Sequence, residues 1–199
     1  FGPVTMAAFA AAVKIDAFAY LPVQDFGNAF STFVAQNYGA GQVERLREGV
    51  RKATAVSAAF SCLISAAVVV FARPLMRIFV QAGDTEVLAA GVLYLRVEGA
   101  FYVGIGCLFL LYGFYRAVKR PGMSVVLTVI SLGTRVALAY ALSAVPAIGV
   151  TGIWWSVPIG WLLADGVGVL CYLQTRKRDA LLQTKGKRPE QAGREKEMS

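Results

Sequence analysis

The sequence predicts an all-α fold: a polytopic transmembrane helix bundle with about five spanning helices. Three observations carry this prediction. The chain is 57% hydrophobic and 16% charged, whereas soluble domains are about 45–50% apolar and about 25% charged. Long apolar segments recur along it, and most basic residues are confined to alternate connections between them, as the positive-inside rule describes for membrane proteins.

Spanning about 30 Å of hydrocarbon takes about 20 apolar residues. Five segments meet this length, over residues 4–38, 49–72, 87–118, 123–145 and 150–173. The first is long enough to tilt or to bend at Pro22. Glycines or prolines follow or separate the segments, at Gly39, Gly41, Pro74, Pro121 and Pro146, where helix ends commonly carry them.

Three features between or inside the segments give further expectations. Residues 73–81 are too short to span, and we expect a separate amphipathic piece at the membrane surface. Gly99 and its neighbouring glycines permit either a local bend or a close helix approach, and the sequence leaves both open. Trp154 lies near the outer end of the fifth segment, where an interfacial position is expected.

Charge placement predicts the orientation. Basic residues cluster around 45–52, around 116–120 and in the tail 176–199, which all fall on one side if five helices span. That side is expected to be cytoplasmic. We therefore expect a multi-pass protein of the plasma membrane, the inner membrane of a bacterium, with a cytoplasmic and disordered C-terminal tail. Because an odd number of spans would begin outside, we also expect a preceding segment to be missing.

Several ionisable residues fall within the apolar segments. Each costs about 2.5–3.5 kcal/mol at the bilayer centre, so such residues usually face a cavity or pair with one another. One interpretation is structural ion pairing, of Lys14 with Asp16 or of Arg135 with Glu98. The other is that Asp16 and Glu98 line a cavity that exchanges a proton or a sodium ion. The full set of cavity-lining or cation-coupling candidates is Asp16, Glu98, Asp25, Asp165 and Arg135.

Other site chemistry is not indicated. The chain has no His, and its three Cys lack metal-ligand spacing, so we assign no metal site and expect no cofactor beyond the coupling ion. Gln36 and Asn37 are expected to shape the cytoplasmic end of the first helix. Nucleic acid is not an expected partner, because no nucleic-acid-binding motif accompanies the basic residues. Membrane lipid is an expected partner.

Several sequence blocks resemble one transporter family. KIDAFAYLP and GNAFSTFVAQNYGAGQVERLREGVRKA are similar to the eighth transmembrane segment, and the loop after it, of multidrug and toxic compound extrusion (MATE) transporters. RPLMRIFV, YLRVEG, YRAVKRPGMS and GVTGIWWSVPIGWLLAD then follow the C-terminal lobe of that family in order. The resemblance covers residues 6–172.

The resemblance implies helices eight to twelve of a twelve-helix, two-lobe transporter, with helix seven and the N-terminal lobe absent as a partner. It also implies export of cationic or amphiphilic small molecules in exchange for sodium ions or protons. Some branches use a Glu of helix seven and an Asp of helix ten as a cation site. Glu98 is the one acid deep in the segment corresponding to helix ten. Asp25 and Asp165 depart from the usual family pattern.

Three other functions were weighed. A lipid-linked oligosaccharide flippase of the same superfamily also uses paired helical lobes, but a basic central cavity would favour it and the acids here do not. A structural membrane piece, inactive without an N-terminal half, also fits the chain. An intramembrane aspartyl protease does not fit, because the Gly-Asp pair at Gly83 lies in a loop. No nucleotide-binding glycine loop precedes a Lys, so ATP-driven transport by this chain alone is not expected. We expect a chain that is not an enzyme.

Overall fold

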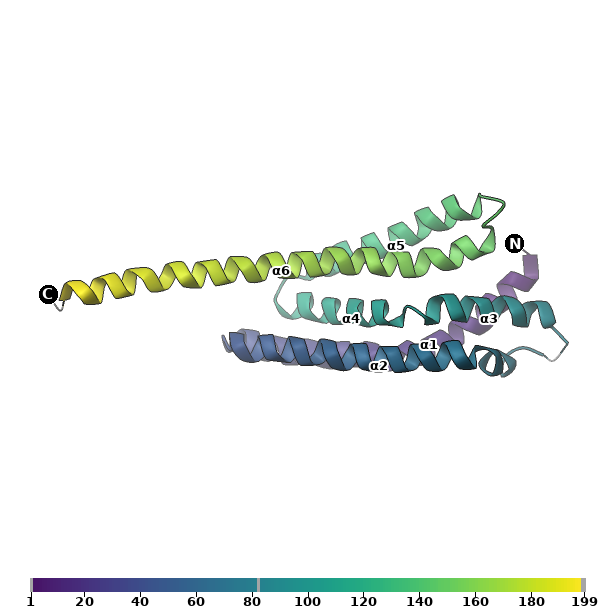
Figure 1. The fold of residues 1–199 in the computed structure, drawn as a ribbon, viewed down its shortest axis with the longest axis horizontal. Coiled ribbons are helices and arrows are strands. Elements are labelled where there is room, and N and C mark those ends of the chain that lie inside the picture. Colours follow the sequence, from purple (N-terminus) through teal and green to yellow (C-terminus); the bar gives the residue numbers. More distant parts are fainter. Residues whose placement is uncertain (1, 82, 198–199) are drawn as a thin grey trace.

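The fold is an antiparallel bundle of long helices (Figure 1). The computed structural model describes the backbone of residues 2–81 and 83–197, and side chains as far as Thr175. Its elements, in chain order, are α1 (Gly2–Gly39), α2 (Val43–Arg77), α3 (Thr85–Gly99), α4 (Tyr102–Ala117), α5 (Pro121–Ser143) and α6 (Val150–Glu197). All of the described secondary structure is helical, which confirms the predicted all-α class.

Four of these helices are long and apolar enough to cross a membrane by themselves: α1, α2, α5 and the Val150–Thr175 part of α6. The fifth candidate span is the pair α3 and α4, which together pass the same test of length and composition. The predicted number of about five spans is reached when this bent pair is counted as one span.

The third predicted span is not one straight helix. It breaks after Gly99 and resumes at Tyr102, and the two halves meet at an angle of 52°. Phe101 has left the helical region, with φ −114° and ψ 18°. Gly99 also lies close to α2, because a Cβ at this position would stand 3.0 Å from Val68 Cγ1. Gly99 therefore lies both at a bend in the third span and at a close approach between helices, the two alternatives that the sequence left open.

The second span is kinked near its predicted end. We expected residues 73–81 to form a separate surface piece, and α2 reaches Arg77 as two helical stretches joined across a kink. The kink lies at Phe71, which has φ −95° and ψ 15°. Proline explains this distortion: Pro74 cannot donate to the carbonyl of Val70 and its ring crowds that turn.

Two groups of helices make up the bundle. α1 and α2 lie beside the broken pair α3 and α4, and α5 packs along α6 (Figure 1). One apolar cluster joins α1, α2, α3, α4 and α6, and it includes Ile15, Leu95 and Trp154. Trp154 is 4% exposed and its ring packs edge-on against Tyr94, so this side chain belongs to the core of the bundle.

The basic segments lie at one end of the bundle, where α1 meets α2 and α4 meets α5, and the chain's C-terminal end extends beyond it (Figure 1). The backbone of 176–197 continues α6 as a helix, where we expected an irregular tail. Ala, Leu, Lys, Arg, Glu and Gln dominate this segment, and these residues have high helix propensity. The side chains of 176–199 lie outside the described ones.

Candidate functional site

Asp16 lies inside the bundle, in the middle of α1, and is 3% exposed. The hydroxyl of Tyr102 donates a hydrogen bond to its Oδ1 atom. Tyr102 is the first residue of α4, just after the break, and is itself 2% exposed. The bend in the third span therefore aims a hydroxyl donor at the acid of the first.

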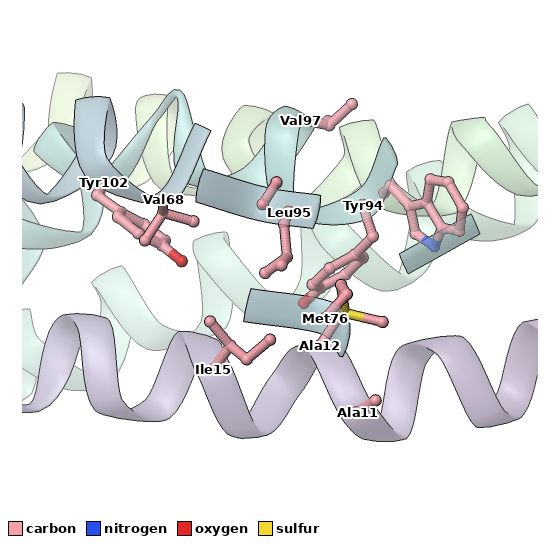
Figure 2. Close-up of a cluster of buried hydrophobic side chains, with 11 residues drawn as sticks. Ala11, Ala12, Ile15, Val68, Met76, Tyr94, Leu95, Val97 and Tyr102 are labelled. Carbon is pink, nitrogen blue, oxygen red and sulfur yellow. The ribbon is translucent and has the colours of Figure 1, made fainter. Parts of the chain in front are cut away.

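A second carboxyl group lies beside the first. Glu98 occupies the last turn of α3 and is 4% exposed. It interacts with the Asp16 carboxyl and with the hydroxyl of Tyr94, one helical turn earlier on α3. In Figure 2 the rings of Tyr94 and Tyr102 both point from their own helices toward the ribbon of α1. Two acids and two phenols thus converge from three helices.

The surroundings of this cluster are apolar. Ile15, Val68 and Leu95 belong to the hydrophobic core that encloses it (Figure 2). Water is therefore a poor source of hydrogen bonds here, and the Oδ2 atom of Asp16 is buried without a hydrogen-bond partner among the described residues. A buried carboxylate oxygen in this condition is costly unless a proton or a cation occupies it.

Neither of the proposed structural ion pairs is present. Within the described side chains, ion pairs occur at the start of α2, between Glu44 and Arg47 and between Glu48 and Lys52. The ammonium of Lys14 instead lies 5.9 Å from the centre of the Phe79 ring. The interpretation that Asp16 and Glu98 are neutralised by Lys14 and Arg135 at salt-bridge distance is therefore wrong.

The other candidates in α1 lie apart from this cluster. Asp25 and Gln36 are exposed, whereas Asn37 is 6% exposed and its Nδ2 donates to the Phe33 carbonyl at 2.8 Å. The Asn37 carbonyl in turn accepts from the Gln42 amide at 2.9 Å, across the turn into α2. Pro22 lies inside α1, which remains one continuous helix across it.

Asp165 forms a separate buried position. It lies on α6, is 9% exposed, and has an Oδ1 atom without a hydrogen-bond partner among the described residues. Its neighbours are on α4: the Cys107 thiol interacts with it, and a Cβ on Gly104 would stand 3.7 Å from its Oδ2. The structure therefore does not join Asp165 to the pair of acids.

Sequence reasoning did not find the two tyrosines. A signal existed in the segment YLRVEG, where Tyr94 and Glu98 are four residues apart and so share one face of a helix. Tyr102 continues the same spacing, but only the break between α3 and α4 turns its hydroxyl to Asp16. That contact joins residues 86 positions apart, beyond the reach of local patterns.

The site is suited to a hard cation or a proton. Its donors are carboxyl and phenol oxygens, and no group of three or more His, Cys, Asp or Glu side chains that could hold a metal ion occurs among the described residues. Oxygen donors favour hard cations, whereas transition metals prefer nitrogen and sulfur. Discontinuous helices at the membrane midplane build such sites in secondary transporters.

Comparison with known families agrees with this architecture. The MatE family model matches residues 1–141. The chain belongs to the MatE family. The predicted family and the predicted all-α membrane fold are therefore confirmed.

Two curated members are similar to this MatE chain. One is the FAD transporter of Shewanella oneidensis, 28% identical over 169 residues, which cover 84% of this chain and 36% of that protein. Another is the probable multidrug resistance protein YpnP of Bacillus subtilis, 29% identical over 174 residues, 86% of this chain and 38% of that protein. The chain thus spans little more than a third of these relatives.

Solved structures show the same relation. The MATE transporter ClbM, in complex with Rb⁺, superposes with a TM-score of 0.76 and 25% identity, over 83% of this chain and 38% of that one. An outward-facing multidrug resistance MATE transporter gives a TM-score of 0.81 at 22% identity, over 91% and 40%. An inward-facing one gives 0.78 at 20%, over 91% and 43%. The chain therefore has the fold of about one lobe.

Proposed function

We propose that the complete protein exports cationic or amphiphilic small molecules by antiport with a sodium ion or a proton. We further propose that Asp16 and Glu98 hold the coupling ion. One observation carries this proposal: two interacting carboxyl groups are buried in an apolar core, and one oxygen of Asp16 has no partner among the described residues.

The physical argument concerns charge. Two carboxylates in contact inside a membrane repel each other and are poorly solvated, so the pair favours sharing a proton or a bound cation. The Tyr102 hydroxyl keeps Asp16 in place without neutralising it. A site that must take up a cation, and that water does not reach freely, can couple ion movement to a change of conformation.

The relatives support the two parts of this proposal in different ways. ClbM was solved in complex with Rb⁺, which supports a monovalent cation as the coupling ion. The FAD transporter and the probable multidrug resistance protein carry names that describe organic substrates. These names support a small-molecule substrate for this chain.

Alternating access would come from a second lobe. The chain resembles the lobe of both an outward-facing and an inward-facing transporter at similar TM-scores, as expected if lobes move largely as rigid bodies. We propose that an N-terminal lobe is the partner and that this chain is inactive without it. We also propose that the basic end of the bundle faces the cytoplasm of a bacterial cell.

Transport in inside-out membrane vesicles tests the function. Vesicles that contain the complete gene product are prepared under three conditions: with a sodium gradient, with a proton gradient, and without an ion gradient. Uptake of a fluorescent cationic dye is then followed over time. We expect one of the two gradients to drive uptake. The double variant Asp16→Asn, Glu98→Gln should lose at least about tenfold of the driven rate, because the amides cannot release a proton or balance a cation.

A matched control separates the site from a general effect of charge removal. Asp84→Asn makes the same chemical change in the exposed connection before α3, and its driven rate should stay within about twofold of the wild type, as for most surface changes. Dye uptake that neither gradient drives would contradict antiport. Uptake that the double variant retains would remove the two acids from the coupling site.

A further inference from the structure

Arg135 is a basic residue inside a membrane-spanning helix. It lies 14 residues after the first residue of α5 and eight before the last, which places it about 21 Å and about 12 Å from the two ends at about 1.5 Å per residue. α5 is long and apolar enough to span, with a mean hydropathy of 1.9. The guanidinium group is therefore expected within the hydrocarbon layer.

The side chain of Arg135 lacks a partner among the described residues. It takes part in none of their ion pairs or side-chain hydrogen bonds, and Glu98, on which it acts electrostatically, does not form a salt bridge with it. An arginine at this depth costs about 2.5–3.5 kcal/mol, and such residues are normally paired with an anion or face a cavity. Its partner is not among the described residues.

The packing holds this arginine on the inner side of α5. A Cβ on Gly160 of α6 would stand 2.6 Å from Arg135 Cγ and 3.4 Å from its Cδ. The missing side chain of Gly160 thus makes room for the aliphatic stem of Arg135, which is half-buried. Arg96 differs in this respect, because it is exposed on α3 and its stem is free to extend toward the membrane surface.

The charge of Arg135 is felt by residues on two other helices. It acts electrostatically on Tyr20 of α1 as well as on Glu98 of α3. Thr128 lies seven residues earlier, on nearly the same face of α5, and its hydroxyl donates to the Tyr112 hydroxyl of α4 at 3.3 Å. The face of α5 that carries Arg135 is therefore the face toward α4.

We propose that Arg135 binds a carboxylate or phosphate group of the transported molecule. A guanidinium fork matches both groups in geometry and forms two parallel charged hydrogen bonds with them. The substrate would then be amphiphilic with a negative group, rather than a simple cation. This inference rests on the proposed function, since it names a group on the molecule which that function moves.

Equilibrium binding to the purified complete protein tests the inference. The probes are ciprofloxacin, a fluorescent zwitterion with a carboxylate, and its methyl ester, which keeps the basic amine and lacks the negative charge. We expect the wild type to bind the acid more tightly than the ester. Arg135→Gln should weaken binding of the acid by about 10- to 100-fold, the value of a hydrogen bond to a charged group, and change the ester by less than about twofold.

Two further variants keep the result interpretable. Arg135→Lys keeps the charge but loses the fork, so it should retain part of the preference for the acid, and it guards against misfolding of Arg135→Gln. Arg96→Gln removes one charge from the exposed face of α3 and should leave both probes unaffected. Wild-type protein that binds acid and ester alike, or Arg135 variants that weaken both alike, would overturn the inference and indicate a structural arginine.

Failure of the proposed function gives a different result. The ester has no anionic group, so its gradient-driven export in vesicles reports on antiport without Arg135. Absence of gradient-driven export of both the acid and the ester in the wild type would contradict the proposed function, whereas equal binding of acid and ester contradicts the role of Arg135.

Discussion

Two buried acids lie on either side of the broken span, and their surroundings differ. Asp16 on α1 receives a hydrogen bond from Tyr102 and has Glu98 as a neighbour. Asp165 on α6 has the Cys107 thiol beside it. Their exposed fractions are alike, 3% and 9%. Burial therefore does not distinguish the two positions, but their partners do.

The difference shows what a coupling site needs beyond a desolvated carboxyl group. A lone buried acid can remain protonated and neutral without consequence for its neighbours. Two acids that share one site cannot both stay charged, so they respond together to an added proton or cation. By this argument we propose the pair on α1 and α3 as the coupling site, and Asp165 as a structural residue between α4 and α6.

The largest expected difference in transport rate is between a change at Glu98, in the pair of acids, and a change at Asp165. Glu98→Gln should lower the gradient-driven transport rate by about tenfold or more, because the remaining acid no longer shares a cation. Asp165→Asn keeps the size of the side chain and should change the rate by less than about threefold. Initial transport rates in inside-out vesicles are measured for both variants. An equal loss of transport rate in the two variants would show that the two positions do not differ in function.

A second comparison uses two buried phenols. Tyr102→Phe removes the donor to Asp16, and a hydrogen bond to a charged group contributes about 1.5–3 kcal/mol, so the apparent affinity for the coupling ion should shift by about tenfold. Tyr115 donates to the Gly168 carbonyl at 2.7 Å, joining α4 to α6. Tyr115→Phe should lower thermal stability without moving the ion affinity. An unchanged ion affinity in Tyr102→Phe would remove that tyrosine from the site.

A third comparison concerns the glycines of α4. A Cβ on Gly113 would stand 2.5 Å from the carbonyl oxygen of Gly27 on α1, and backbone cannot move aside cheaply. Gly113→Ala should therefore cost about 1–3 kcal/mol of stability. On the Asp165 side, a Cβ on Gly104 would meet Trp161 Cβ at 3.5 Å, an ordinary contact, so Gly104→Ala should be tolerated. The melting temperatures of the two variants in detergent are compared. Equal melting temperatures would contradict the close approach of α4 to α1 at Gly113.

The smallest expected effect concerns buried hydroxyls. Ser57 and Ser61 of α2 have hydroxyl oxygens that are buried without a hydrogen-bond partner among the described residues. The double change to Ala should leave the melting temperature unchanged or raise it slightly, since it removes unpaired polar groups. Ser156 donates to the Ile153 carbonyl at 2.5 Å, so Ser156→Ala should cost about 0.5–1.5 kcal/mol. A large loss in the double variant would indicate a partner from another segment.

Much of the fold followed from local properties of the chain. The five spans were predicted from apolar length, and their turns from glycine and proline, because both properties act within a few residues. The break after Gly99 was one of two interpretations that the sequence left open, since a glycine in a membrane helix serves bending and packing equally well. The kink of α2 at Phe71 lies next to the predicted end of the second span, because a proline distorts the helical turn that precedes it.

The candidate site was predicted only in part. The sequence singled out Asp16 and Glu98 as acids near the membrane midplane, and it kept Asp25 and Asp165 as further candidates. It offered Lys14 and Arg135 as their counter-charges, and neither forms an ion pair in the structure. Depth along a helix can be counted in residues, whereas the direction of a side chain around the bundle cannot be fixed until the neighbouring helices are in place.

The amino-acid order by itself determined a helical membrane bundle with its basic ends gathered on one side, because hydropathy and charge are properties of each segment alone. The tertiary structure decided which acids meet, since the contact between Asp16 and Tyr102 depends on how α1 packs against a bent α3–α4 pair. That packing sums many weak side-chain contacts across distant parts of the chain, and no single segment contains it.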